Sequence, residues 1–212
     1  MIIKWFGYSY FRIDTQNKIL AINPYSEADT GLRPAYFKSD ILLLSNPKND
    51  IRKKTDIKDE PFLLAGAGEI EKGNVFVEGV VSSYDAKEKE SSNLNIIYII
   101  DSEDIIVAHL GNLRKKKLRD SILEKVSQAD ILLLPIGGHD GLDAEEAMFL
   151  TNQIEPKIVI PMNYALPGGK VKLDLADKFI KTFEKKSEKL SKLVIKKNQL
   201  PSETKLIILE KS

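Results

Sequence analysis

The sequence has no cysteine among its 212 residues. This absence excludes disulfide bonds, thiolate nucleophiles and zinc sites built on cysteine. Histidine is scarce too, because it occurs only at His109 and His139. Any imidazole that acts as a general base or as a metal ligand must therefore come from one of these two residues.

The chain also lacks an excess of charge of one sign, since 32 Lys and Arg residues balance 31 Asp and Glu residues. This balance argues against a surface that binds nucleic acid as a whole, although it allows a local basic patch. No stretch approaches the roughly 20 apolar residues that a membrane span needs. Residues 1–14 lack the apolar core and the cleavage site of a secretory signal. We therefore expect a cytoplasmic protein that does not enter a membrane.

The hydrophobic pattern predicts strands in the first half of the chain and alternating strands and helices in the second. Strands are expected at residues 2–6, 10–14, 18–22, 40–44, 62–64, 75–81, 95–100, 105–110, 131–134, 157–160 and 205–209. Helices are expected at residues 119–126, 143–154 and 173–185, the second of them capped by Asp143 and Glu146. This order predicts two sheets packed face to face with helices outside, in one domain over residues 1–212.

Polar or glycine residues follow several of these apolar strands. The segment from Leu42 to Ile51 reads LLLSNPKNDI, in which a run of leucines stops at small polar residues. Similar changes occur at residues 82–84, 111–112, 137–139 and 162–163. If these strands are neighbours, their ends meet along one edge, and we expect a pocket there.

Three segments of the sequence carry a family resemblance. In order and spacing, Gly66-Ala67-Gly68-Glu69, His109-Leu110-Gly111-Asn112 and Pro135-Ile136-Gly137-Gly138 resemble the metallo-β-lactamase superfamily. The similarity is to its small zinc-dependent hydrolases of the ascorbate-lactonase type, and it extends from Lys4 to residues 205–209. It implies an α/β fold, a four-layer αββα sandwich, with the active site along one sheet edge.

The resemblance also implies which positions would bind metal. The family holds one or two metal ions with a His-x-His-x-Asp-His loop, further histidines and a bridging aspartate. Here the matching positions carry mostly uncharged or cationic side chains. They are Asn46, Lys48, Asp50 and Ile51 in the loop, Tyr84 or the adjacent Asp85 for the next histidine, Asn112 for the bridging aspartate and Asn163 for the last histidine. Two accessory positions, a histidine and an aspartate in the family, carry Tyr8 and Asn23.

These replacements change the chemistry of the matching positions. Zinc prefers imidazole, thiolate or carboxylate, whereas an asparagine amide is a weak donor. Protonated Lys48 has no lone pair and repels a dication. Asp50 is then the one good ligand, and a single carboxylate neither holds zinc tightly nor produces a metal-bound hydroxide near neutral pH. We therefore expect no zinc and no other cofactor.

The function that this reasoning favours is a homologue of the hydrolases that has lost its metal ligands and binds rather than cleaves. Its binding pocket would comprise Asn46, Lys48, Asp50, Tyr84, Asn112 and Asn163. The alternative is an active metal-dependent hydrolase of phosphodiesters or lactones with non-standard ligands. Its catalytic candidates are His139, His109 and Asp50. The competing interpretations are a hydrogen-bonded structural role for His109 and a surface position for His139.

Basic residues follow two of the strand ends. Arg114, Lys115 and Lys116 come shortly after Asn112, and residues 52–54 follow the degenerate loop. Both runs are typical either of solvated surface or of a site for phosphate, a nucleotide or a nucleic-acid backbone. The expected partner is therefore an anionic small molecule or nucleic acid. A third hypothesis is a structural subunit that forms a homo-oligomer or pairs with a metal-competent paralogue.

Overall fold

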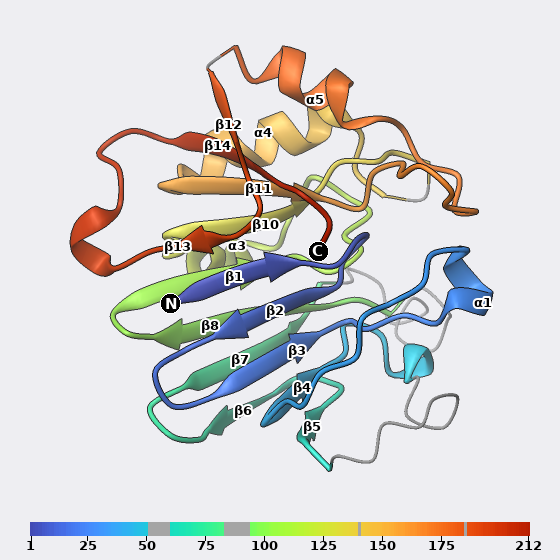
Figure 1. Ribbon diagram of the computed structural model, residues 1–212. Helices are drawn as coiled ribbons and strands as arrows, with labels where there is room; N and C mark the ends of the chain where they lie inside the picture. The colour runs from blue at the N-terminus through green and yellow to red at the C-terminus, as the bar shows by residue number, and fades with distance from the viewer. Residues whose placement is uncertain (51–59, 83–93, 140, 185) are drawn as a thin grey trace.

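The computed structural model describes residues 1–50, 60–82, 94–139, 141–184 and 186–212. Its first sheet is drawn in blue, cyan and red in Figure 1. In spatial order this sheet contains β13 (Leu193–Val194), β1 (Ile2–Trp5), β2 (Phe11–Asp14), β3 (Ile19–Ile22), β4 (Ile41–Leu43) and β5 (Phe62–Leu64). β1, β2 and β3 are antiparallel, whereas β3, β4 and β5 run parallel.

The second sheet packs against the first. In spatial order it contains β12 (Ser187–Leu190), β14 (Lys205–Leu209), β11 (Ile158–Met162), β10 (Ile131–Pro135), β9 (Ile105–His109), β8 (Ile96–Ser102), β7 (Phe76–Val81) and β6 (Gly68–Glu71). β9, β10, β11 and β14 run parallel, with Leu133 paired to His109 on one side and Ile160 on the other. Parallel neighbours end at the same edge, and this edge carries the polar segments that follow β9, β10 and β11.

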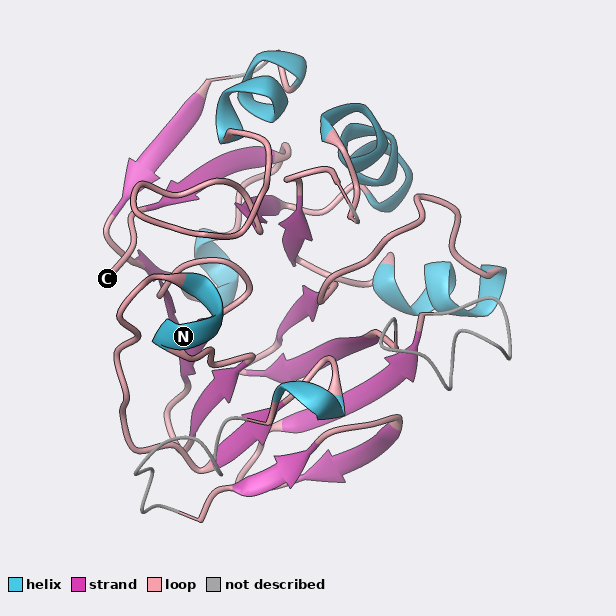
Figure 2. Cartoon of the chain, turned by 90° about the vertical axis from the view of Figure 1, so that its right-hand side faces the viewer, coloured by secondary structure: helices cyan, strands magenta, loops and turns pink. Residues whose placement is uncertain are grey.

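The helices lie outside the sheets (Figures 1 and 2). They are α1 (Glu27–Thr30), α3 (Asp120–Val126), α4 (Ala144–Ile154) and α5 (Ala176–Thr182), with short 3₁₀ helices η1 (Pro47–Asn49) and η2 (Lys197–Gln199). The predicted cap of α4 is confirmed, because the Asp143 carboxylate accepts from the Glu146 amide at 2.8 Å. α5 is shorter than predicted, since the Asp174 backbone bonds to Gly137 and Ala165 instead of joining the helix.

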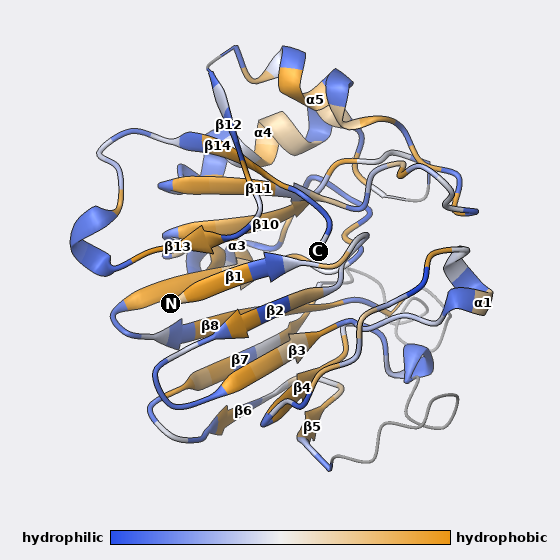
Figure 3. Cartoon of the chain, in the orientation of Figure 1, coloured by the Kyte–Doolittle hydropathy of each residue, from blue (hydrophilic) through white to orange (hydrophobic). Residues whose placement is uncertain are grey.

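Side-chain alternation explains the layers. In β4, Ile41 and Leu43 enter the main core between the sheets. Leu42 and Leu44 enter a second cluster on the outer face of the first sheet. The leucine run therefore forms a strand covered on both faces, as predicted. Figure 3 shows the same hydrophobic character along β3, β10 and β11.

Different segments cover the two outer faces. Buried residues of α3, α4 and α5, such as Ile122, Leu150 and Phe179, belong to the main core with the second sheet. The outer face of the first sheet packs against Tyr25 and Leu32, on either side of α1. The prediction of two packed sheets with helices outside is thus confirmed. None of the helices in the described ranges is long and apolar enough to cross a bilayer.

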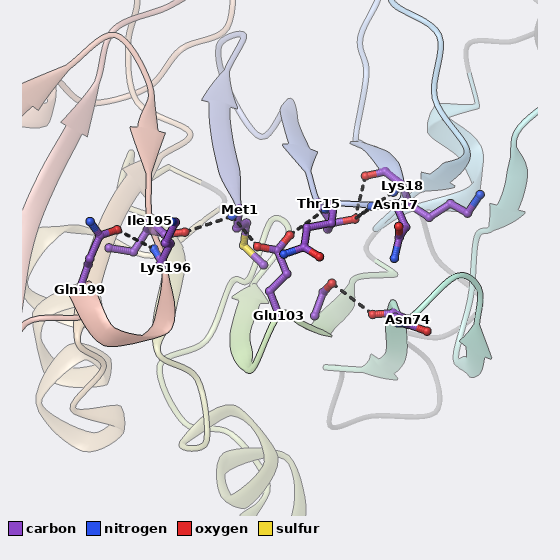
Figure 4. A network of polar contacts seen from close by, with 11 residues as sticks. Met1, Thr15, Asn17, Lys18, Asn74, Glu103, Ile195, Lys196 and Gln199 are labelled. Atoms are coloured by element: carbon purple, nitrogen blue, oxygen red, sulfur yellow. Dashed lines mark hydrogen bonds and ion pairs between the residues drawn. The ribbon is translucent and has the colours of Figure 1, made fainter.

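At the edge opposite the site, polar contacts join the two sheets (Figure 4). The Glu103 carboxylate, in the β8–β9 turn of the second sheet, accepts from the Met1 ammonium at 2.6 Å and from the Gln16 amide at 2.8 Å. The Met1 ammonium also donates to the Ile195 carbonyl at 3.0 Å. These contacts hold the start of β1 against both its own sheet and the β8–β9 turn.

Candidate functional site

A pocket lies at the edge of the fold where the ends of the central strands meet, and this edge faces the viewer in Figure 2. Its larger compartment has a volume of about 430 Å³. The lining residues that matter most below are Tyr8, Asn23, Lys48, Asn112, His139 and Asn163. They come from segments far apart in the sequence, so the predicted convergence of strand ends brings them to one cavity.

A smaller compartment of about 240 Å³ adjoins the larger one. Ser9, Asn23, Asn49 and Asn112 line both compartments, which we therefore call the joined pocket. The smaller compartment is also lined by Ser45, Asn46, Leu94, Asn95 and Arg114. Its wall consists mainly of amide and hydroxyl groups, with Arg114 as a cation.

The backbone around the larger compartment is unusual. Tyr8, Asn23, His139 and Asn163 have φ angles of 49°, 51°, 55° and 52°, in the left-handed region that side chains disfavour. Such residues cost of order 1–3 kcal/mol each and persist where the surrounding structure enforces them, often at functional sites. Their concentration around one cavity marks it as the part of the fold in which geometry is most tightly imposed.

His109 lies beneath this pocket and is fully buried. Its Nδ1 accepts from the Gly111 amide at 3.1 Å, so its Nε2 carries the proton and donates to the Ser9 carbonyl at 3.0 Å. Burial lowers the pKa of His109 from 6.5 to about 4. The imidazole is therefore neutral at pH 7, and it positions two backbone segments that border the pocket.

Asn95 organises the loop after β9, although the sequence did not single it out. Its side-chain oxygen accepts from the Asn112 amide at 2.7 Å, and its Nδ2 donates to the Leu110 carbonyl and to Ser82, each at 3.0 Å. A Cβ on Gly111, whose φ is 62°, would lie 2.2 Å from the same oxygen. Asn95 thus requires glycine at 111 and determines where Asn112 lies. Its position directly before an apolar strand was the available signal.

Asn163 is held at the centre of the site. Its amide donates to the Tyr8 carbonyl at 3.1 Å, and its Nδ2 lies 3.4 Å from the Asn112 side-chain oxygen. Gly137 permits this arrangement, because a Cβ there would lie 1.9 Å from the Asn163 carbonyl oxygen. Asn112 and Asn163, predicted from separate strand ends, are therefore in contact.

Two tyrosines form part of the larger compartment. The Tyr8 hydroxyl donates to the Thr30 carbonyl at 3.3 Å, and the Tyr25 hydroxyl donates to the Phe6 carbonyl at 2.7 Å. Burial raises the pKa of Tyr8, and it raises the pKa of Tyr25 to about 12. Both phenols therefore remain protonated donors at neutral pH.

The predicted site residues in the loop after β4 lie in different places. Asn46 caps η1 by accepting from the Lys48 amide at 2.9 Å, and it lines the smaller compartment. Lys48 is exposed and lines the larger compartment. Asp50 ends η1, and its amide donates to the Pro47 carbonyl at 3.4 Å. Tyr84 lies outside the described residues, as do Ile51 and Asp85.

The basic residues that follow Asn112 also have different surroundings. Arg114 is partly buried and lines the smaller compartment. Lys115 and Lys116 are exposed, and the Lys116 ammonium lies 5.6 Å from the centre of the Phe149 ring on α4. His139, the other histidine, is exposed at the rim of the larger compartment.

The donors of the pocket bear on metal binding. Within the described ranges, no group of three or more His, Cys, Asp or Glu side chains is arranged to hold a metal ion. The pocket presents amide oxygens from Asn112 and Asn163, which are poor zinc ligands. The described residues therefore do not by themselves fit the family's zinc site.

Comparisons with known proteins identify a matching family model and several relatives of this chain. A family model described as the beta-lactamase superfamily domain matches residues 2–163. A UPF0173 protein from Pyrococcus abyssi is 28% identical over 192 residues, which cover 80% of this chain and 86% of the relative. A UPF0173 metal-dependent hydrolase from Lysinibacillus sphaericus is 28% identical over 194 residues, which cover 77% and 85%.

Solved structures show the same architecture. A candidate Zn-dependent hydrolase of the metallo-β-lactamase superfamily from Thermotoga maritima aligns with a TM-score of 0.81 and 24% identity, covering 98% of this chain and 97% of that one. A metallo hydrolase from Ignicoccus hospitalis aligns with a TM-score of 0.65 and 18% identity, covering 100% and 95%.

The expectation that the protein has no metal cofactor is contradicted by these comparisons. The relatives include proteins named metal-dependent hydrolases, and the similar structures include one named for zinc. The expectation was wrong because it took into account only the side chains at the family's standard ligand positions. Metal ions also accept carboxylate, amide, backbone and water oxygens, so replaced histidines do not by themselves exclude a metal.

Proposed function

Because this chain belongs to the metallo-β-lactamase superfamily, we propose that it is a hydrolase whose small polar substrate binds in the joined pocket. The relatives named metal-dependent hydrolases support this reading over a non-catalytic one. Lactones and phosphodiesters are the substrate classes that we propose to test first.

One observation carries the choice of site. Four non-glycine residues with left-handed backbones, Tyr8, Asn23, His139 and Asn163, line the same compartment. A binding site needs its groups held in place before the substrate arrives, and an enforced backbone provides this preorganisation. The cavity is also large enough for a small molecule and lies at the ends of the parallel strands.

The residues of the pocket suggest roles in binding and orientation. The amide groups of Asn112 and Asn163 meet at the centre, where they would donate hydrogen bonds to a substrate carbonyl or phosphoryl oxygen. His139, exposed at the rim, is the candidate for moving a proton. Buried His109 would act through position alone, because both ring nitrogens are already hydrogen-bonded.

The relatives' names support a reaction that depends on a metal ion, which would polarise the scissile bond and activate water. Since the described residues do not assemble a complete site for it, we assign no step to a metal and name no ligands. Metal content of the purified protein, measured by elemental analysis, addresses this part of the proposal directly.

The test combines turnover with matched variants. The protein is assayed on small lactones and on bis(p-nitrophenyl) phosphate, with and without chelator. Asn163→Gly keeps the backbone freedom that φ 52° requires but removes the amide, and Asn74→Gly makes the same change at φ 59° in the β6–β7 turn. We expect the first variant to lose about 10²-fold in kcat and the second to be unchanged. Turnover that survives Asn163→Gly, or no turnover on either substrate class, would contradict the proposal.

A second candidate is a protein that binds a ligand without cleaving it. The observation that favours it is the preponderance of uncharged amides in the smaller compartment, including Asn46, Asn49 and Asn95. Saturable binding without turnover in metal-supplemented protein would support this candidate. Association with itself or with a related subunit is a further proposal, and sedimentation at high protein concentration tests it.

A further inference from the structure

Arg114 is the cation of the described lining of the smaller compartment. We propose that the substrate is a small organic anion whose carboxylate or phosphate group binds Arg114 in the smaller compartment. The uncharged, hydrolysable part would then lie in the larger compartment beside Asn163. This inference rests on the proposed function and adds to it the chemical class of the substrate.

The Arg114 side chain is available for an anion. No hydrogen bond or ion pair joins it to another described residue, and it is only partly buried. None of the described residues that line its compartment is acidic. A guanidinium with no carboxylate among the described residues of its compartment, in a wall of amides and hydroxyls, is suited to pair with an oxyanion in two parallel hydrogen bonds.

The backbone around Arg114 is held firmly. The Asn112 amide donates to the Asn95 side chain at 2.7 Å, and the Leu113 carbonyl accepts from the Leu142 amide at 3.2 Å. The Leu113 side chain is buried in the main core. These contacts place the base of the Arg114 side chain against the smaller compartment, which reduces the entropy lost when an anion binds.

The described lining of the larger compartment carries more cations than acids, so its charge has the same sign as Arg114. Lys48 and Lys172 line it as cations, whereas Asp29 is the acidic residue of its described lining. The Asp29 carboxylate also accepts from the Ser26 hydroxyl at 2.6 Å. An excess of cations over acids along the described lining would favour the approach of an anion.

The placement of the basic run favours a small anion over nucleic acid. A compartment of about 240 Å³ has room for a phosphate or carboxylate group, and Arg114 is the one residue of the basic run that lines it. Lys116 lies instead near Phe149 of α4. A polyanion would use several cations of one continuous surface, whereas these residues reach different surroundings.

The binding experiment uses inorganic phosphate and acetate as probes, at constant ionic strength. Two-dimensional proton–nitrogen NMR of the backbone amides at positions 112 and 114 reports binding in the smaller compartment, because both residues line it. We expect saturable shifts, and at least a tenfold weaker Kd for the better probe in Arg114→Gln. Lys116→Gln, the matched control, should leave the Kd unchanged. The preferred probe distinguishes a phosphate from a carboxylate site.

Three outcomes would overturn the proposal. These are no saturable binding of either probe, equal Kd values in the two variants, or a greater loss in Lys116→Gln, which would indicate a polyanion surface. Arg114→Lys, which keeps the charge but not the paired donors, should fall between wild type and Arg114→Gln. Because Arg114 is partly exposed, thermal melts should show these variants folded like wild type.

A turnover experiment separates this inference from the proposed function. A lactone that carries a free carboxylate is compared with its methyl ester. If Arg114→Gln lowers kcat/KM for the carboxylate alone, both ideas are supported. If the two lactones are cleaved equally and the variant has no effect, the hydrolase survives and the anion site does not. If phosphate binds through Arg114 but nothing is cleaved, the hydrolase fails and the anion site stands.

Discussion

His109→Gln tests whether the buried imidazole makes the protein sensitive to acid. In the folded protein both ring nitrogens are hydrogen-bonded and the ring is neutral, with a pKa lowered by burial from 6.5 to about 4. The unfolded chain binds a proton near pH 6.5, whereas the folded protein resists it. The contribution of neutral His109 to the free energy of unfolding is therefore fully present above pH 6.5 and is lost as the pH falls towards 4.

The magnitude follows from these two values. Between pH 7 and pH 5 the linkage relation gives a loss of about 2 kcal/mol in the free energy of unfolding, and the full loss below pH 4 is about 3 kcal/mol. Glutamine can donate and accept in the same place but cannot titrate. His109→Gln should cost about 1–3 kcal/mol at pH 7, because it imperfectly replaces buried hydrogen bonds, and should abolish the loss between pH 7 and pH 5.

Urea unfolding provides the assay, followed by the fluorescence of Trp5, which is buried and is the sole tryptophan. The range from pH 7 to pH 5 leaves most carboxylates ionised. His139→Asn is the matched control, because His139 is exposed and asparagine tolerates its left-handed backbone. Equal pH dependence in wild type and His109→Gln would refute the reasoning, as would a His109 proton signal that titrates near pH 6.5.

Three further substitutions probe the elements that support the site, each by urea unfolding. Gly111→Ala should cost roughly 2–4 kcal/mol, since its backbone is left-handed and its Cβ would meet Asn95; a cost below 1 kcal/mol would show that the loop readily shifts. Tyr98→Phe should cost about 1–2 kcal/mol, because the hydroxyl donates from β8 to the Leu44 carbonyl of the other sheet at 2.8 Å; an unchanged midpoint would contradict this bridge. Asp143→Ala should cost about 1 kcal/mol by removing the cap of α4, and Asp143→Asn should restore most of it.

The fold was predictable where local chemistry and burial agree. The leucines before Ser45 predicted a strand covered on both faces, and the structure places Leu42 and Leu43 in different clusters. By contrast, the edge strands β6 and β12 read GEIE and SEKL, without an apolar run. β6 pairs with β7, and β12 pairs with β14. These two segments become strands because of their neighbours in the sheet, and their own sequences do not reveal those neighbours.

The candidate site was predictable in part. Polar residues after separate strands do line one pocket, and Asn112 contacts Asn163. Reading positions singly also led to the wrong expectation about metal. Comparison with relatives corrected it, because a family is recognised from the whole chain, whereas ligand chemistry depends on all donors that meet in space.

The sequence by itself determined the alternation of apolar and polar residues, and with it the two sheets, the cap of α4 and the strand ends that face a pocket. Only the tertiary structure decided that Arg114 lines this pocket while Lys116 lies near Phe149, and that Asn95 positions the loop between them and β9. The reason is physical. Local pattern specifies which face of an element is buried, but the environment of a side chain depends on residues brought to it from distant parts of the chain.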